Sequence, residues 1–172
     1  MQVSPGEIYE RYRLGADWFN RQNPSLQAHR FAERCAQGAL VLEVGAGSGA
    51  DAKFLRRSGL SVVTTDIQSN VADVLCAFEH LPFRDSVFDG VYARGVIHLC
   101  DSHMAQAEAL RVLRPGGTLF VSYLLDIITD GHRLDVMGVL TWGDVSKVVI
   151  EKTSIRRDVD HVHQVVETMV IK

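Results

Sequence analysis

The chain has 172 residues, 47% hydrophobic and 23% charged, which suits one domain with a buried core and excludes two large ones. A formal net charge of −3 argues against general binding to nucleic acid or to anionic membranes. Three widely spaced cysteines do not form a disulfide framework, and no apolar stretch is long enough to span a bilayer. Since Met1–Glu7 also lacks the features of a signal peptide, these features predict a cytoplasmic protein with neither membrane nor nucleic acid as partner.

Two helices are predicted ahead of the first strand, so that residues 1–38 form a helical cover on a core at 39–172, within a single domain spanning 1–172. The first helix, over 5–21, carries an aromatic face formed by Tyr9, Tyr12, Trp18 and Phe19. Packing of this face on the sheet and coverage of a ligand are both open interpretations.

The second helix is predicted from its ends. Asn23 has the side chain of an N-cap, and Pro24 suits the first helical position. The helix is expected to run to about Gln37, where Gly38 ends it.

A strand over 39–44, a glycine-rich loop and a helix from Ala50 to about Ser58 follow. Gly45, Gly47 and Gly49 allow sharp turns and let a ligand approach the main chain. The loop satisfies both G-x-G-x-x-A, a dinucleotide fingerprint, and E-x-G-x-G-x-G, the loop of S-adenosylmethionine (SAM)-dependent methyltransferases. The carboxylate of Glu43 favours SAM, because it can hold the ammonium group of a methionine moiety and would repel a pyrophosphate.

Residues 61–66 form a β-branched strand that ends in Asp66, 21 residues after Gly45. A carboxylate at this position can accept hydrogen bonds from both ribose hydroxyls of a nucleoside. The spacing therefore supplies the second half of either fingerprint.

Only Ile67 to Val71 separate this strand from the apolar run Ala72–Cys76. A full crossover helix needs ten or more residues, so the helix between strands 2 and 3 is expected to be abbreviated. The alternative is a helix over 69–78 with the third strand lost.

The remaining elements alternate in type and end in a hairpin. A helix begins at Asp101 or Ser102 and reaches Leu113, because its apolar residues fall on one face. The predicted strands of this half span 88–93, 118–124, 148–156 and 161–171. Since four residues join the last two strands, these strands must be antiparallel.

The motifs resemble those of small class I (Rossmann-like) SAM-dependent methyltransferases of the methyltransferase-11 type. The chain contains the L-P-F-x-D-x-x-F-D-x-V block at 81–91 and the R-V-L-x-P-G-G block at 111–117, after the glycine loop and Asp66. The resemblance implies an α/β three-layer sandwich with a seven-stranded, mostly parallel sheet. Its strand order would be 3-2-1-4-5-7-6, with strand 7 antiparallel.

The resemblance also implies a cofactor site that binds SAM and releases S-adenosylhomocysteine (SAH). Its methionine end would be held by residues Glu43, Gly45, Ala46, Gly47 and Gly49. The ribose would be held by Asp66, with Ile67 on the adenine, Phe78 at its border, and Arg94 and Gly95 near the methyl group. Relatives usually bind the adenine amino group with an Asp where this chain has Ala77, and that lost hydrogen bond is worth about 1 kcal/mol.

His98 follows the fourth strand and is a candidate general base, although relatives also use a histidine there to cap and pack the next helix. The candidates for lining an acceptor pocket are Tyr12, Trp18, Asp126, His132 and Trp142. Asp158–His163 contains residues that ligate metals, but a solvated hairpin end explains it better, so no metal is expected.

The leading hypothesis is transfer of a methyl group to a small molecule by in-line displacement. A non-catalytic, methyltransferase-like binding or scaffold protein is the alternative, motivated by Ala77 and the short crossover. An enzyme that uses a dinucleotide is the third hypothesis. A homodimer is also possible for this chain.

Overall fold

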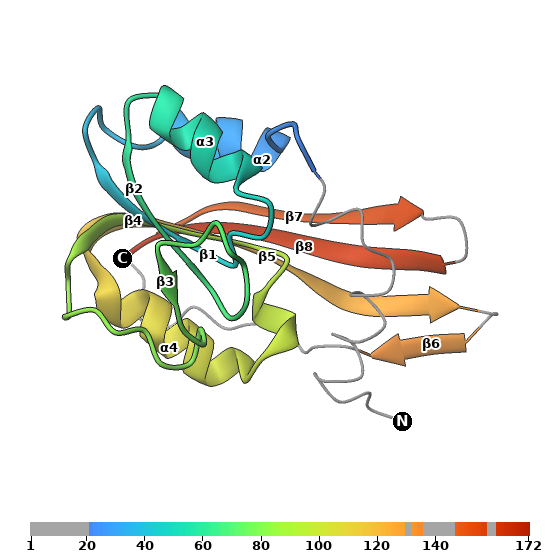
Figure 1. Cartoon of the computed structure of the whole chain (residues 1–172). Coiled ribbons are helices and arrows are strands. Elements are labelled where there is room, and N and C mark those ends of the chain that lie inside the picture. The colour runs from blue at the N-terminus through green and yellow to red at the C-terminus, as the bar shows by residue number, and fades with distance from the viewer. Residues whose placement is uncertain (1–20, 130–131, 136–146, 158–160) are drawn as a thin grey trace.

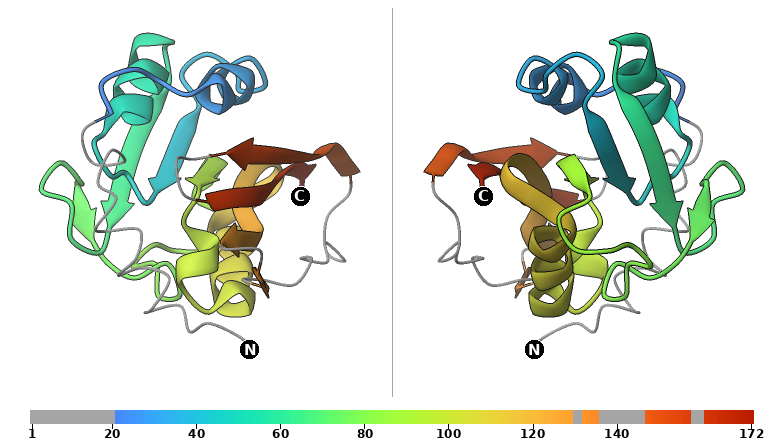
Figure 2. Two further views of the ribbon diagram at one scale, coloured as in Figure 1. Left: turned by 90° about the vertical axis from the view of Figure 1, so that its right-hand side faces the viewer. Right: turned by 90° about the vertical axis from the view of Figure 1, so that its left-hand side faces the viewer.

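The computed structural model describes residues 21–129, 132–135, 147–157 and 161–172, with side chains described over 21–123 and 165–172. Helices cover both faces of one central sheet: α2 and α3 lie on one face and α4 on the other (Figure 1 and Figure 2). The described elements are α2 (Leu26–Ala32), β1 (Leu40–Val44), α3 (Ala50–Arg57), β2 (Ser61–Asp66), β3 (Val74–Leu75), β4 (Phe88–Arg94), the 3₁₀ turn η1 (Ile97–Leu99), α4 (Ser102–Val112), β5 (Leu113–Thr129), β6 (His132–Asp135), β7 (Lys147–Arg157) and β8 (His161–Ile171).

The sheet order is β3-β2-β1-β4-β5-β8-β7, with β6 paired to β5 beside this path. The strands from β3 to β5 run parallel, whereas β8 runs antiparallel to both β5 and β7. The predicted 3-2-1-4-5-7-6 order and antiparallel strand 7 are therefore confirmed. The strand count was too low by one, because β5 extends to Thr129 and forms a hairpin with β6.

The abbreviated crossover between β2 and β3 is also confirmed, since the described residues 67–73 contain turns and bends but no helix. Asp73 closes it: its Oδ2 accepts hydrogen bonds from the Thr64 backbone N–H and hydroxyl, both at 2.8 Å. The Asp73 N–H in turn donates to Thr64 Oγ1 at 2.9 Å. The hydrogen bonds between Thr64 and Asp73 thus hold the short crossover against β2, in a connection that contains no helix.

The prediction for the helix before β1 was wrong at both ends. The N-cap is Ser25, whose Oγ accepts from the Ala28 N–H at 3.1 Å, and the helix is only Leu26–Ala32. Gly38 has a left-handed φ of 76° and donates its N–H to Gly59 O at 2.9 Å, so it turns the chain into β1. Ser25 displaced the predicted cap because a tertiary hydrogen bond holds its backbone N–H, as described below.

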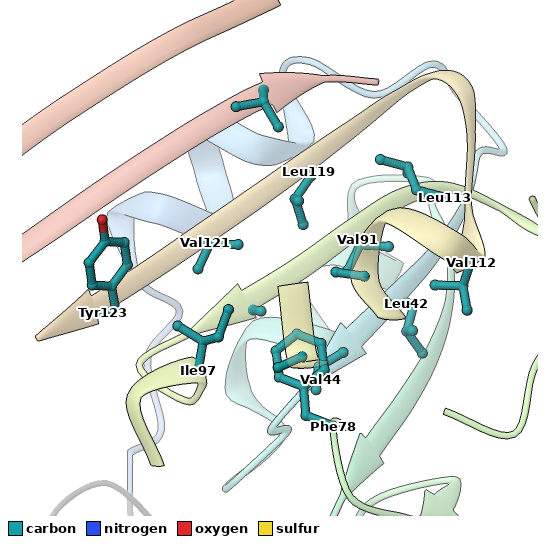
Figure 3. Packing of buried hydrophobic residues seen from close by; sticks show 14 of the residues in the cluster. Leu42, Val44, Phe78, Val91, Ile97, Val112, Leu113, Leu119, Val121 and Tyr123 are labelled. Carbon is teal, nitrogen blue, oxygen red and sulfur yellow. The ribbon is translucent and has the colours of Figure 1, made fainter. Parts of the chain in front are cut away.

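Alternation along β1 distributes its side chains between two hydrophobic clusters. Val41 joins the cluster under α2 and α3, and Leu42 and Val44 join the larger cluster under α4. Figure 3 shows that larger cluster, with Phe78 beside Val44. Glu43 therefore shares the α2–α3 face with Val41, and this face carries the polar groups of the site.

Side chains bind the backbone at both ends of α4. Asp101, one of the two residues expected at the start of this helix, is the N-cap and accepts from the His103 and Met104 N–H groups at 3.1 and 3.0 Å. Lys172 Nζ donates to Leu110 O at 2.7 Å and Leu113 O at 2.8 Å, at the negative end of the helix dipole. Within the residues that the structure describes, no helix is long and apolar enough to cross a membrane.

The packing of α2 against the sheet depends on Gly90. A Cβ at this residue would lie 2.9 Å from Phe31 Cζ and 3.3 Å from Val41 Cγ2. We expect Gly90→Ala to lower the free energy of unfolding by about 1–3 kcal/mol, measured by urea denaturation, because the added methyl overpacks the cluster. Phe31→Leu removes the ring atoms that the added methyl would meet. The double variant should therefore lose less free energy of unfolding than the two single variants together, and additive losses would contradict this account.

Candidate functional site

The glycine loop joins β1 to α3 at the carboxyl edge of the parallel strands. Gly45, Gly47 and Gly49 have φ values of 74°, 52° and 72°, a left-handed region that other residues rarely adopt. At Gly45 space is limiting as well, because a Cβ would lie 3.0 Å from Val96 Cβ. The pattern predicted from the sequence therefore has a backbone cause at each glycine.

Asp66 at the end of β2 is hydrogen-bonded to this loop. Its Oδ2 accepts from the Gly47 N–H at 3.0 Å. Its Oδ1 accepts from the N–H groups of Gln68 and Ser69 at 3.0 and 3.1 Å. A carboxylate has about four acceptor positions, so Oδ2 retains capacity for a further donor. Ser69 completes the contact by donating its hydroxyl to Gly47 O at 2.7 Å.

The residues that would surround an adenine differ in exposure. Ile67, next to Asp66, is 58% exposed, which is unusual for a large aliphatic side chain and leaves an apolar surface beside the loop. Phe78 is only 3% exposed and belongs to the cluster under α4, so core packing is its observed role. Ala77 precedes it and is half-buried.

The segment after β4 faces the glycine loop through Val96. Arg94 ends β4, and Gly95, with a φ of 67°, donates its N–H to Ser122 O at 2.9 Å and to Ser122 Oγ at 3.1 Å. His98 lies in η1 and is 6% exposed, flanked by the fully buried Ile97. These bonds hold the turn that would carry a base near the site.

Asp51, in the first turn of α3, is the acceptor in a buried polar cluster that sequence reasoning missed. Its Oδ1 accepts from Arg21 Nη1 at 2.9 Å and from the Ser25 N–H at 2.7 Å. Its Oδ2 accepts from Ser25 Oγ at 2.9 Å and Tyr92 Oη at 3.1 Å, and lies 2.8 Å from Arg21 Nη2. Burial raises the pKa of Asp51, but the bonds from Arg21 and Ser25 outweigh it and leave that pKa below its ordinary value.

In the sequence, Asp51 stands out only as an acidic residue in the first turn of a helix, where the helix dipole favours a negative charge. Its partners come from 30 residues earlier and 41 residues later in the chain, and no local pattern connects them. The exception is Ser25, since serine is a favoured N-cap residue and stands directly before the helix Leu26–Ala32. Burial and the charge of Asp51 raise the pKa of the Tyr92 hydroxyl well above its ordinary value, which keeps it a neutral donor.

Glu43 lies on β1 next to this cluster, directly opposite Tyr92 in the β1–β4 register. It is 3% exposed, and its Oε2 has no hydrogen-bond partner among the described residues. Burial and the charge of Asp51 raise the pKa of Glu43 to about 8, against smaller opposing effects of Arg21 and Arg56. The side chain is therefore protonated at neutral pH when no cation lies beside it.

Several other predicted site residues lie outside what the structure describes. Tyr12, Trp18 and Trp142 fall in undescribed segments. Asp126 and His132 lie on the β5–β6 hairpin, with their side chains undescribed. Over the part of the chain that is described, no group of three or more His, Cys, Asp or Glu side chains could hold a metal ion.

Residues 42–121 match a family described as a methyltransferase domain. The chain is 31% identical over 147 residues to methyltransferase GfsG of Streptomyces halstedii, a match that covers 73% of this chain and 49% of that protein. It is 35% identical over 130 residues to a probable S-adenosylmethionine-dependent methyltransferase of Mycolicibacterium smegmatis, covering 69% of this chain and 48% of that one.

A solved structure shares the fold: Burkholderia thailandensis 1,6-didemethyltoxoflavin-N1-methyltransferase with bound 1,6-didemethyltoxoflavin and SAH. The two chains are 18% identical, with a TM-score of 0.69 over 98% of this chain and 86% of that one. The chain belongs to the class I, Rossmann-like family of SAM-dependent methyltransferases. It spans about half the length of the curated relatives it matches.

The raised pKa of Glu43 predicts a pH dependence of stability. In the folded chain the pKa is about 8 rather than 4.5, so the folded state binds the extra proton between these values. The protonated Glu43 side chain therefore makes its full contribution to the free energy of unfolding below pH 4.5. This contribution is lost as the pH rises through 8, at a rate of at most about 1.4 kcal/mol per pH unit. Asp51, with its lowered pKa, loses its contribution only as the pH falls through the acid range.

We expect Glu43→Gln to remove the fall in stability between pH 4.5 and 8. The measurement is the free energy of unfolding from urea denaturation at a series of pH values across this range. The exposed Glu33 provides a matched control, since Glu33→Gln should retain the wild-type slope. Parallel profiles for the wild type and Glu43→Gln would contradict the assignment.

Proposed function

We propose that this chain binds SAM at the carboxyl ends of β1 and β2 and transfers its methyl group to a small-molecule acceptor. The observation that carries the proposal is the contact between the glycine loop and Asp66, a 3.0 Å hydrogen bond from the Gly47 N–H. It joins the two halves of the nucleoside-binding fingerprint across neighbouring strands.

The side chains present fit the parts of SAM. The unpartnered Oε2 of buried Glu43 suits an ammonium group, and Asp66 has acceptor capacity for a ribose hydroxyl. The 58% exposed Ile67 offers an apolar surface for a purine. Ser48 Oγ is a second buried polar atom of the loop without a partner among the described residues. Unpaired buried groups are costly, and a polar ligand would satisfy them.

In this proposal the protein acts mainly by positioning. Bound SAM supplies a methyl group already activated on a sulfonium. The glycine loop, held by Gly49 N–H to Ala46 O at 2.8 Å and by Ser69 to Gly47 O, fixes the methionine end. Asp66 fixes the ribose, and Arg94 and Gly95 border the methyl group. Alignment of this kind can supply a large share of a rate enhancement.

His98 is the proposed base for an acceptor that carries a proton. Its near-complete burial means that it would act on a group brought into the site rather than on one in bulk water. A change of His98 to Asn should then lower kcat and alter its pH profile while leaving SAH binding intact.

The acceptor class rests on the charge of the chain, since a net charge of −3 offers no general affinity for the phosphates of nucleic acid. A cytoplasmic location is a further prediction.

The acceptor classes can be distinguished by incubating the protein with isotope-labelled SAM and a set of small hydroxyl, amine, thiol and carbon acceptors. Bulk tRNA is tested as a separate acceptor, and mass spectrometry identifies the labelled product. Labelled tRNA would overturn the small-molecule assignment, and SAM binding without transfer to any acceptor would favour the binding or scaffold role.

Asp66→Asn tests the cofactor site. The amide nitrogen of Asn would face backbone N–H groups, and the charge-assisted bond to the ribose would be lost. We expect SAH affinity to fall about 10–100-fold by calorimetry. The matched control is Asp85→Asn in the exposed loop before β4, at the opposite end of the parallel strands, and it should bind as the wild type does. Equal affinities for wild type and Asp66→Asn would exclude this role.

A further inference from the structure

Among the residues that the structure describes, the two carboxyl groups of the polar cluster, Asp51 and Glu43, have one closely paired cation between them. Arg21 binds Asp51 in a two-point contact, with Nη1 to Oδ1 at 2.9 Å and Nη2 to Oδ2 at 2.8 Å. Arg21 Nη1 also donates to Asn23 O at 3.0 Å. Asp51 thus receives the guanidinium, and Glu43 has no comparable partner within the described chain.

The groups that face Glu43 come from two elements, α3 and β4, and from the segment before α2. On α3 these are Asp51, which repels its charge, Arg56, which attracts it, and the Ala52 N–H, which donates to it. Arg21 attracts it from the segment before α2, and Tyr92 faces it from β4. None of these contacts satisfies Oε2, which is buried with no partner among the described residues.

We propose that Glu43 exchanges a proton for the ammonium group of the cofactor's amino-acid end. In the free protein the carboxyl is neutral, because a second buried charge beside Asp51 would be uncompensated. Binding of the ammonium supplies the missing cation, so the O–H bond of Glu43 breaks and its proton passes to the solvent. The carboxylate keeps the electron pair, and the ammonium keeps its three hydrogens and donates to it.

This inference rests on the proposed function, and it gives Asp51 a positioning role in it. By holding Arg21 in a two-point contact, Asp51 keeps the guanidinium from neutralising Glu43 and leaves that site to a ligand cation. The raised pKa of Glu43, about 8, agrees with a proton present before binding at neutral pH.

Calorimetry of SAH binding in buffers of different ionisation enthalpy measures the exchange. At about pH 6.5 we expect close to one proton released per SAH bound, and an SAH affinity that rises about tenfold per pH unit toward neutrality. 5′-Methylthioadenosine has the same adenosine and sulfur without the amino-acid end, so it should bind with no proton release.

Glu43→Gln should abolish the proton release and make the SAH affinity independent of pH, while its affinity for 5′-methylthioadenosine is unchanged and shows that the site is folded. Glu33→Gln, a change of an exposed acid, should release the proton as the wild type does. Binding of SAH without proton release, or release that persists in Glu43→Gln, would overturn the exchange. Failure of both ligands to bind would instead overturn the cofactor assignment, and the exchange with it.

Discussion

The buried carboxylate of Asp51 is the constraint on which the site depends. A charge that is 1% exposed is tolerable only when fully hydrogen-bonded, and Asp51 draws its donors from two separate segments. Arg21 and Ser25 fix the entry to α2, and Tyr92 fixes β4. Because Asp51 follows the glycine loop by two residues, the same bonds set where that loop leaves the sheet. Ser25 caps α2 with the side chain that also contacts Asp51, so helix and site are specified together.

The two other family blocks are joined to each other by the side chain of Arg111. Arg111, from the second block, donates to Phe83 O at 2.8 Å and Leu81 O at 3.0 Å in the first, and pairs with Asp85 at 2.8 Å. It also binds Glu108 one turn earlier in α4. The blocks occur together because one supplies the guanidinium and the other the carbonyl groups that it requires.

Asp89 makes a similar link at the amino end of the sheet. Its Oδ1 lies 2.6 Å from Arg114 Nη1, and its Oδ2 accepts from the Leu40 N–H at 2.8 Å. This pair joins the starts of β1, β4 and β5, opposite the glycine loop. The spacing within these blocks therefore has a structural cause at the edge of the sheet opposite the glycine loop.

The short crossover has a consequence for the exposed surface. Three large aliphatic side chains near β2 and β3 lie open to solvent: Ile67, Val71 and Leu75, at 58%, 47% and 65% exposed. A crossover helix would ordinarily cover this edge of the sheet. Val71 also lies near the glycine loop, since a Cβ at Gly49 would meet its Cγ2 at 3.2 Å. The abbreviated segment thus leaves apolar surface exposed beside the glycine loop.

The sheet order followed from the resemblance of the motifs to those of a known family. The sequence by itself determined the glycine loop, the strand that ends at Asp66 and the abbreviated crossover, because each depends on local periodicity, on φ preferences or on the number of residues between strands. It also determined the family, through motifs whose spacing along the chain is fixed. Only the tertiary structure decided that Ser25 rather than Asn23 caps α2, since the Ser25 N–H is held by Asp51 from α3. It likewise revealed that Arg21 pairs with Asp51 and leaves Glu43 uncompensated. Charge balance in a buried cluster depends on distances between segments far apart in the chain, and no linear pattern carries those distances.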